Sequence, residues 1–179
     1  MKYNIYEFVP YSFDKDYGQA CNEYCELVPN DDDWIIIRDT DILSLTPSHM
    51  HKIREVINKY PDTGLFTCLT NRVKQKKQVA DMSLFDNSDM KVHRRLALDL
   101  VNKPIDAPVI PYVISGYCMI FKKSTWKTVK GFKHGILGVD NNFSWRMRQH
   151  GFNVRLIKNV YYFHYYRMLE GINDKSHIK

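Results

Sequence analysis

The stretch Trp34-Ile35-Ile36-Ile37-Arg38-Asp39-Thr40-Asp41 decides the fold that the sequence of this 179-residue chain predicts. Its first four residues form a continuous apolar run, which is typical of a central strand buried on both faces of a sheet in an α/β domain. Two carboxylates, Asp39 and Asp41, follow the end of that strand. In open α/β sheets ligands bind beyond the carboxyl ends of the strands, so the two acids stand where a ligand is expected.

The segments around this strand alternate between strand and helix patterns. The pattern predicts strands over 5–9, 34–37 and 64–69, and helices over 16–27 and from Thr46-Pro47 to about Tyr60. Asp14 or Asp16 would cap the first helix. The order strand–helix–strand–helix–strand predicts an α/β fold with an open, mostly parallel mixed sheet flanked by helices.

The rest of the chain predicts further helices and strands of the same domain. Helices are expected over 89–101, 124–129 and 140–150, and strands over 112–121, 154–157 and 160–163. The first of these strands is interrupted at Ser115-Gly116, which indicates a bulge or a close approach to the backbone. We expect one domain over 1–167, followed by a polar tail over 168–179.

Composition and charge disfavour some classes of protein, such as membrane-spanning and zinc-binding proteins. No apolar run approaches the ~20 residues that cross a bilayer, and no apolar signal segment follows Met1, so a soluble cytoplasmic protein is expected. The four cysteines form no CxxC pair, which disfavours a zinc site. Residues 1–70 carry a net charge of −6 and residues 71–179 a net charge of +12. This division suits a site where a cation meets a phosphorylated ligand, although a basic surface or a nucleic-acid patch would also produce it.

The two acids after the strand are candidate metal ligands. Hard cations such as Mg²⁺ and Mn²⁺ take oxygen ligands and keep open positions for phosphate oxygens. Asp39 and Asp41 could therefore hold a cation that neutralises a diphosphate leaving group. An isolated DxD is more often a capped surface turn, and its position directly after the strand favours the metal.

Four sequence blocks together resemble the GT-A glycosyltransferases of the large inverting family two. The blocks run from Asp16 to Asn22 and on to Asp33-Trp-Ile-Ile-Ile-Arg-Asp39-Thr-Asp41, then Ser115-Gly-Tyr-Cys-Met-Ile-Phe…Gly131-Phe132, then Gly138-Val-Asp140…Phe143-Ser-Trp-Arg-Met-Arg-Gln-His-Gly151, and last Val160-Tyr-Tyr-Phe-His164. They occur in the order of that family and cover residues 3–167, so the resemblance implies a single GT-A, Rossmann-like domain.

The resemblance also implies roles for individual residues. Asp39, Asp41 and His164 would bind Mn²⁺ or Mg²⁺, and Asp140 would be the catalytic base that deprotonates the acceptor. Nucleotide contacts would come from Val9, Pro10, Tyr11 and Asn22. The donor and acceptor sugars would meet Ser115, Gly116, Asp39 and Trp145.

Each of these residues also has a structural interpretation. Asp140 could be the N-cap of its helix, His164 an ordinary residue at the end of a strand, and Trp145 a packing residue. A helix N-terminus would keep the carboxylate of Asp140 ionised and make it a weaker base. Several cations could contact phosphate or be surface residues: Arg72, Lys74, Arg146, Arg148 and Arg167.

Three functions follow from these observations. The first is a metal-dependent, hexosyltransferase-type enzyme that moves a sugar from a nucleotide diphosphate sugar to a glycan, lipid-linked, protein or nucleotide acceptor, with inversion. The second is a noncatalytic sugar- or nucleotide-binding module of the same fold, because the stretch before Asp39 is shorter than in typical relatives. The third is a metal-dependent nucleic-acid-processing enzyme, although no stable nucleic-acid partner is expected. A homo-oligomer is compatible with all three.

Overall fold

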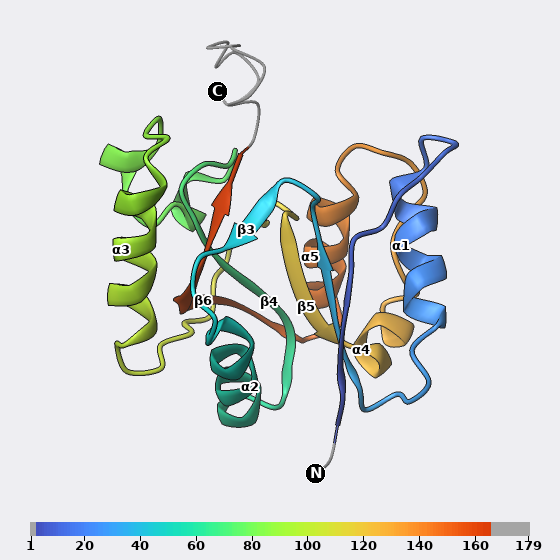
Figure 1. The fold of residues 1–179 in the computed structure, drawn as a ribbon. Helices are drawn as coiled ribbons and strands as arrows, with labels where there is room; N and C mark the ends of the chain where they lie inside the picture. The colour runs from blue at the N-terminus through green and yellow to red at the C-terminus, as the bar shows by residue number, and fades with distance from the viewer. Residues whose placement is uncertain (1–2, 166–179) are drawn as a thin grey trace. The chain divides into compact units, whose positions relative to one another are not determined.

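The computed structural model of the protein describes residues 3–165, and Figure 1 shows its helices and strands. The strands are β1 (Ile5–Phe8), β2 (Trp34–Arg38), β3 (Ile42–Ser44), β4 (Thr63–Thr70), β5 (Cys118–Lys122) and β6 (Asn153–His164). The helices are α1 (Tyr17–Glu26), α2 (His49–Lys59), α3 (Met90–Val101), α4 (Lys123–Thr128) and α5 (Val139–Gln149), with 3-10 turns η1 (Lys76–Gln78) and η2 (Met82–Leu84). The expected α/β class is confirmed. The expected tail over 168–179 and Arg167 lie outside the described residues.

The strands form a six-stranded mixed sheet in the order β1-β2-β5-β4-β6-β3. β1 pairs with β2 in parallel, whereas β5 is antiparallel to both β2 and β4, and β3 is antiparallel to β6. Because β5 opposes both of its neighbours, β2 and β4 run in the same direction. The strand–helix–strand pattern therefore predicted the direction of these two strands correctly, but the sheet is more antiparallel than expected because β5 inserts between them.

The chain divides into two compact units. Within the described residues the first unit comprises 3–40, 62–67 and 109–155, and the second comprises 41–61, 68–108 and 156–165. Strand β4 contributes its first part to the first unit and its last three residues to the second.

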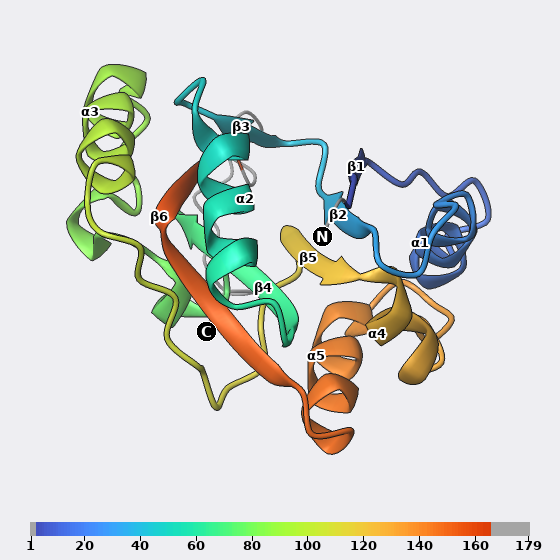
Figure 2. The ribbon, with the colours of Figure 1, turned by 90° about the horizontal axis from the view of Figure 1, so that it is seen from below.

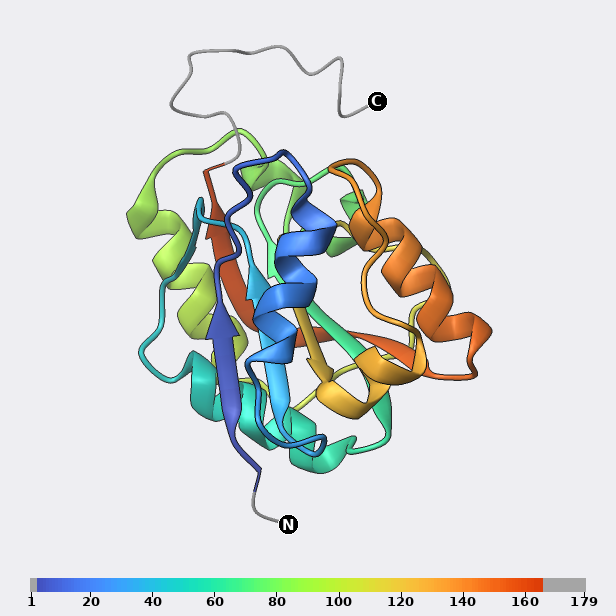
Figure 3. The same ribbon diagram turned by 90° about the vertical axis from the view of Figure 1, so that its right-hand side faces the viewer.

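In the first unit an aromatic core stands between the strands and their helices. Figures 1 and 3 show α1, α4 and α5 on one side of β1, β2 and β5. Ile35, Ile36 and Ile37 are fully buried, as the apolar run predicted. Phe121 of β5 packs against Phe143 of α5 with their ring centroids 5.0 Å apart. Burial of such rings is the main contribution to the stability of this core.

Side-chain caps explain where two of the helices begin. Asp16 precedes α1, and its Oδ1 accepts the backbone N–H of Gln19 at 2.9 Å, which confirms one of the two expected caps. Asp89 precedes α3 and accepts from the N–H of Lys91 at 2.8 Å. Both contacts satisfy a backbone donor that has no partner within its helix.

In the second unit β6 is one continuous strand, so the expectation of two strands over 154–157 and 160–163 is wrong. The polar pair Lys158-Asn159 looked like a break between them. Instead, the Asn159 amide is buried and bonded outside the strand: its Oδ1 accepts from the N–H of Asp106 at 2.7 Å, and its Nδ2 donates to the carbonyl of Pro104 at 2.8 Å. A polar residue with all its partners satisfied can stay inside a strand.

No helix in residues 3–165 has the length and apolar character that crossing a membrane requires.

Candidate metal centre

The pairing of β3 with β6 brings Asp41 and His164 together in the second unit. Ile42, the first residue of β3, lies opposite His164, the last residue of β6. The carbonyl of Asp41 accepts the N–H of Tyr165 at 2.9 Å, which extends this pairing by one step. As a result His164 Nε2 lies 3.2 Å from Oδ1 of Asp41. Two residues that are far apart in sequence thus present their side chains at one point, as the resemblance implied.

Asn71 and Arg72 fix the backbone and the Nδ1 atom of His164, away from the Nε2 atom that lies near Asp41. Asn71 Oδ1 accepts the backbone N–H of His164 at 2.7 Å, and Asn71 Nδ2 donates to the carbonyl of His164 at 3.2 Å. His164 Nδ1 lies 2.9 Å from the carbonyl oxygen of Arg72. Asn71 and His164 are 1% and 3% exposed, so these bonds are shielded from water. The imidazole is therefore fixed before any ligand arrives.

The contact with Arg72 decides which ring nitrogen faces Asp41 as an acceptor. A carbonyl oxygen can only accept a hydrogen bond, so Nδ1 carries a proton. In a neutral imidazole Nε2 then presents a lone pair toward the carboxylate of Asp41. A divalent cation between the Nε2 lone pair and the carboxylate oxygen would satisfy both atoms. A backbone carbonyl behind a histidine is also the usual support of a metal ligand.

Asp39 adds a third ligand atom. A carboxylate oxygen of Asp39, one of Asp41 and a ring nitrogen of His164 all lie within 4.8 Å of one another. A single residue, Thr40, separates Asp39 from Asp41 along the chain, so covalent connection keeps the two acids near each other. The N–H of Asp39 donates to the carbonyl of Tyr117 at 2.9 Å, which continues the β2–β5 pairing past Arg38.

Asp140 is held by backbone donors in the first unit. It lies in the first turn of α5, where the N-cap is Gly138, so the N-cap interpretation of Asp140 is wrong. Its Oδ2 accepts the N–H of Gly116 at 2.7 Å and its Oδ1 that of Asn141 at 2.8 Å. Burial raises the pKa of Asp140, and these N–H groups and nearby Lys133 only partly oppose it. Asp140 is therefore a stronger base than the helix N-terminus alone predicted.

Tyr17 is a residue that the sequence did not single out. Its hydroxyl oxygen is buried and makes no conventional hydrogen bond. Burial is the main cause that raises the pKa of Tyr17, and the neighbouring groups Cys21, Asp39 and Asp140 add to it. Tyr17, Asp39 and Asp140 all belong to the first unit, so this hydroxyl is electrostatically coupled to both acids.

The four expected nucleotide contacts have different surroundings in the first unit. Pro10 is buried and Val9 is half-buried, whereas Tyr11 is exposed and its ring stands edge-on to Phe13 at 5.1 Å. Asn22 instead ties α1 to the loop after α4: its Oδ1 accepts from the N–H of Phe132 at 2.7 Å, and its Nδ2 donates to the carbonyl of the same residue at 3.0 Å. Both ends of this amide are thus bonded within the protein, and the role of Asn22 as a nucleotide contact stays a prediction.

The remaining candidates divide into surface and structural residues. Trp145 is half-exposed on α5. Two of the three arginines bind backbone carbonyls, Arg146 that of Val129 and Arg148 that of Tyr112. Arg72 is 4% exposed, with Asp86 3.8 Å from its guanidinium. Arg72, Arg146 and Arg148 therefore have contacts within the protein. The sequence had allowed either a phosphate contact or a surface position for each of them. Ser115 is half-buried beside Gly116.

In comparisons with known proteins, no family model and no curated protein matches the chain.

Proposed function

We propose that this protein is a metal-dependent glycosyltransferase that transfers a sugar from a nucleotide diphosphate sugar to an acceptor hydroxyl with inversion. The observation that supports it most is the group Asp39, Asp41 and His164, with two carboxylates and an imidazole whose Nε2 is directed at a carboxylate. Two oxygen ligands and one nitrogen ligand suit Mn²⁺ better than Mg²⁺, which prefers oxygen alone. Three protein ligands also leave coordination positions for phosphate oxygens.

The resident groups would divide the reaction as follows. A divalent cation bound there would neutralise the negative charge that develops on the leaving diphosphate. Asp140 accepts the proton of the acceptor hydroxyl while the acceptor oxygen forms its bond to the anomeric carbon. The bond from that carbon to the donor's phosphate oxygen breaks at the same time, and its electron pair leaves with the diphosphate. Attack from the face opposite the leaving group inverts the configuration.

The surroundings of Asp140 support its role as the base. Its pKa is raised by burial, which improves proton acceptance from a weak acid such as a hydroxyl. The two backbone N–H groups that bind it fix its position, and a fixed carboxylate meets the acceptor without having to reorganise. The exposed face of Trp145 on the same helix is a surface on which a sugar ring could stack.

The test is a thermal-shift screen of UDP, GDP, CDP, ADP and dTDP with and without Mn²⁺, followed by hydrolysis and transfer assays with the matching sugar nucleotides. A ligand at roughly a hundredfold excess over its Kd stabilises the folded state by about 2.7 kcal/mol. We expect one nucleotide to raise Tm only when Mn²⁺ is present. Asp39→Asn should abolish that shift, whereas Asp62→Asn, at an exposed acid outside the group, should leave it unchanged.

The outcomes separate the competing functions. Turnover that requires Mn²⁺ and Asp140 supports the transferase. A Mn²⁺-dependent nucleotide shift without turnover would favour the noncatalytic module instead. A Mn²⁺ shift that no nucleotide alters would overturn the proposal.

A further inference from the structure

A cavity lies wholly within the second unit, and the proposed reaction does not use it. Its volume is about 600 Å³, which falls in the range of small-molecule sites. It is lined by Leu69, Lys77, Val79, Ala80, Leu100, Lys103, Pro104, Asp106, Leu156, Lys158 and Asn159. Neither Asp41 nor His164 is among these residues, so the cavity is distinct from the metal centre.

Backbone hydrogen bonds build the walls of this cavity. On one side the N–H of Ala80 donates to the carbonyl of Thr70 at 2.9 Å, which attaches 79–80 to the end of β4. On the other side the N–H of Lys158 donates to the carbonyl of Asp106 at 2.9 Å, so the segment after α3 runs beside β6 (Figure 2). The buried amide of Asn159 fixes the same segment from within. The cavity is therefore part of the folded framework of the unit.

The floor of the cavity is apolar. Leu69, Leu100 and Leu156 are 8%, 8% and 4% exposed, and Val79, Ala80 and Pro104 complete an aliphatic lining. No aromatic ring is among the lining residues. Such a surface favours a flexible hydrocarbon or the flat face of a small apolar body, and burying it releases water from both partners.

The rim of the cavity is cationic. Lys77, Lys103 and Lys158 are exposed at the surface and line the same cavity. Asp106 is the single acid of the lining, and its Oδ2 lies 2.9 Å from Nζ of Lys158. Three lysines against one carboxylate leave an excess of positive charge above an apolar floor. This combination is complementary to a molecule with an apolar body and one anionic end.

We propose that the cavity between the end of α3, β6 and the 77–80 segment binds an amphipathic anion, that is, a carboxylate or sulfonate attached to an apolar chain or ring system. The apolar body occupies the leucine floor, and the anionic end meets the lysine rim. Binding requires neither the metal nor a nucleotide, so failure of the proposed transferase activity would leave this inference standing, and the reverse also holds.

The probe is 8-anilinonaphthalene-1-sulfonate, an apolar sulfonate whose fluorescence rises when it leaves water. We expect saturable binding at one site per chain, displaced by dodecanoate and not by the neutral dodecanol. Lys103→Glu and Lys77→Glu should each weaken the probe's apparent Kd by about fivefold, because each reverses a charge worth up to about 1 kcal/mol at the surface. Ala80→Phe should weaken it further by filling the floor.

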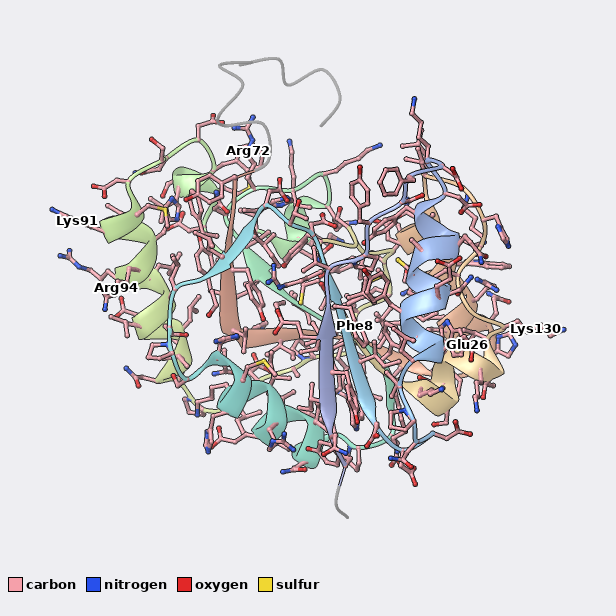
Figure 4. The ribbon with its side chains drawn as sticks, turned by 45° about the vertical axis from the view of Figure 1, so that its right-hand side comes forward. Phe8, Glu26, Arg72, Lys91, Arg94 and Lys130 are labelled. Carbon is pink, nitrogen blue, oxygen red and sulfur yellow. The ribbon has the colours of Figure 1, made fainter. Side chains whose placement is uncertain are left out.

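The matched control is Lys91→Glu, at an exposed lysine that points away from α3 in the same unit (Figure 4). It removes the same charge from the second unit without touching the cavity. Circular dichroism and Tm verify that each variant is folded. Equal binding by Lys91→Glu, Lys103→Glu and Lys77→Glu, or equal displacement by dodecanol and dodecanoate, would overturn the proposal.

Discussion

Gly116 and Asp140 are in direct contact: a Cβ atom placed on Gly116 would lie 2.4 Å from the Cβ of Asp140 and 3.2 Å from its Oδ2. The same glycine donates its N–H to that oxygen at 2.7 Å. The absence of a side chain at position 116 therefore allows the backbone to hold the proposed base. The sequence indicated a bulge or a close approach at Ser115-Gly116, and the approaching group is Asp140.

Gly116→Ala should displace Asp140 and reduce transfer by at least about tenfold, a loss typical of a misplaced catalytic group. Overpacking should also lower the free energy of unfolding by about 1–3 kcal/mol. The control is Gly151→Ala, where the backbone φ is +80° and no atom lies within 4 Å of the added Cβ. That variant loses stability through backbone strain alone. If it loses as much activity as Gly116→Ala, the contact with Asp140 has no special importance.

Asp140→Asn should raise Tm at neutral pH while reducing kcat by about 10²–10⁴-fold. The amide oxygen can still accept the N–H of Gly116, whereas the bond from the N–H of Asn141 is lost, and the buried charge is gone. The sign follows from linkage: because the pKa of Asp140 is raised in the folded state, its contribution to stability is complete below the unfolded pKa and is lost as pH rises through the folded pKa. The Tm advantage of the variant should thus disappear on acidification. An advantage that does not vary with pH would contradict a raised pKa.

Asn71→Ala should weaken Mn²⁺ binding by about 10–100-fold, as removal of an outer support does at other metal sites. Asn71 contributes no ligand atom to the group and acts through both backbone bonds to His164. Isothermal titration with Mn²⁺ measures the effect. Asn159→Ala is the control because it removes another buried asparagine whose bonds hold a different segment. An equal loss of Mn²⁺ affinity in both variants would indicate general destabilisation instead of a positioning role.

Asp16→Asn should reduce the sensitivity of the protein to acid. The N–H groups of Gln19 and Gly135, together with His134, lower the pKa of Asp16 in the folded state. A lowered pKa contributes stability above the unfolded value and loses it as pH falls through the folded value. Asparagine remains a good N-cap, so Tm at neutral pH should fall only by the part of the stabilisation that depends on the charge. Between about pH 5 and pH 2, where Asp titrates, Tm should fall less in this variant than in the wild type.

Asp14→Asn provides the comparison for that experiment, because Asp14 is an exposed acid two residues before the cap. Its Tm-against-pH curve should follow that of the wild type. A curve for Asp16→Asn that is equally close to the wild type would show that the contacts with Gly135 and His134 do not depend on charge.

The sequence pattern predicted those elements whose formation depends on neighbouring residues in the chain. The apolar run of β2 is buried, and the cap of α1 is Asp16, one of the two acids that the helix signal indicated. Elements that depend on distant partners were missed or misread. β3 has only three residues and exists because β6 pairs with it, and β6 continues through Asn159 because that amide finds partners more than fifty residues earlier in the chain.

The candidate site was predicted to a similar extent. The proximity of Asp41 and His164 agrees with the ordered set of motifs, and the close approach at Gly116 was indicated by the small-residue turn. Asn71 and Tyr17 gave no such signal. The contacts of Asn71 span 93 residues of sequence, and Tyr17 fits the apolar face of a helix equally well whether or not its hydroxyl meets an acid. Residues that act by positioning or electrostatically influencing distant residues do not produce a pattern among their sequence neighbours.

The insertion of β5 between β2 and β4 also affects how the chain is made. β2 and β4 are complete once Thr70 has left the ribosome, but the strand that separates them, β5, ends at Lys122. During synthesis of the intervening residues, β2 and β4 have unpaired backbone edges and uncovered isoleucine and phenylalanine side chains. Such edges invite mispairing and aggregation. We therefore expect slowed translation between these strands to lower the yield of native protein more than slowed translation after β5.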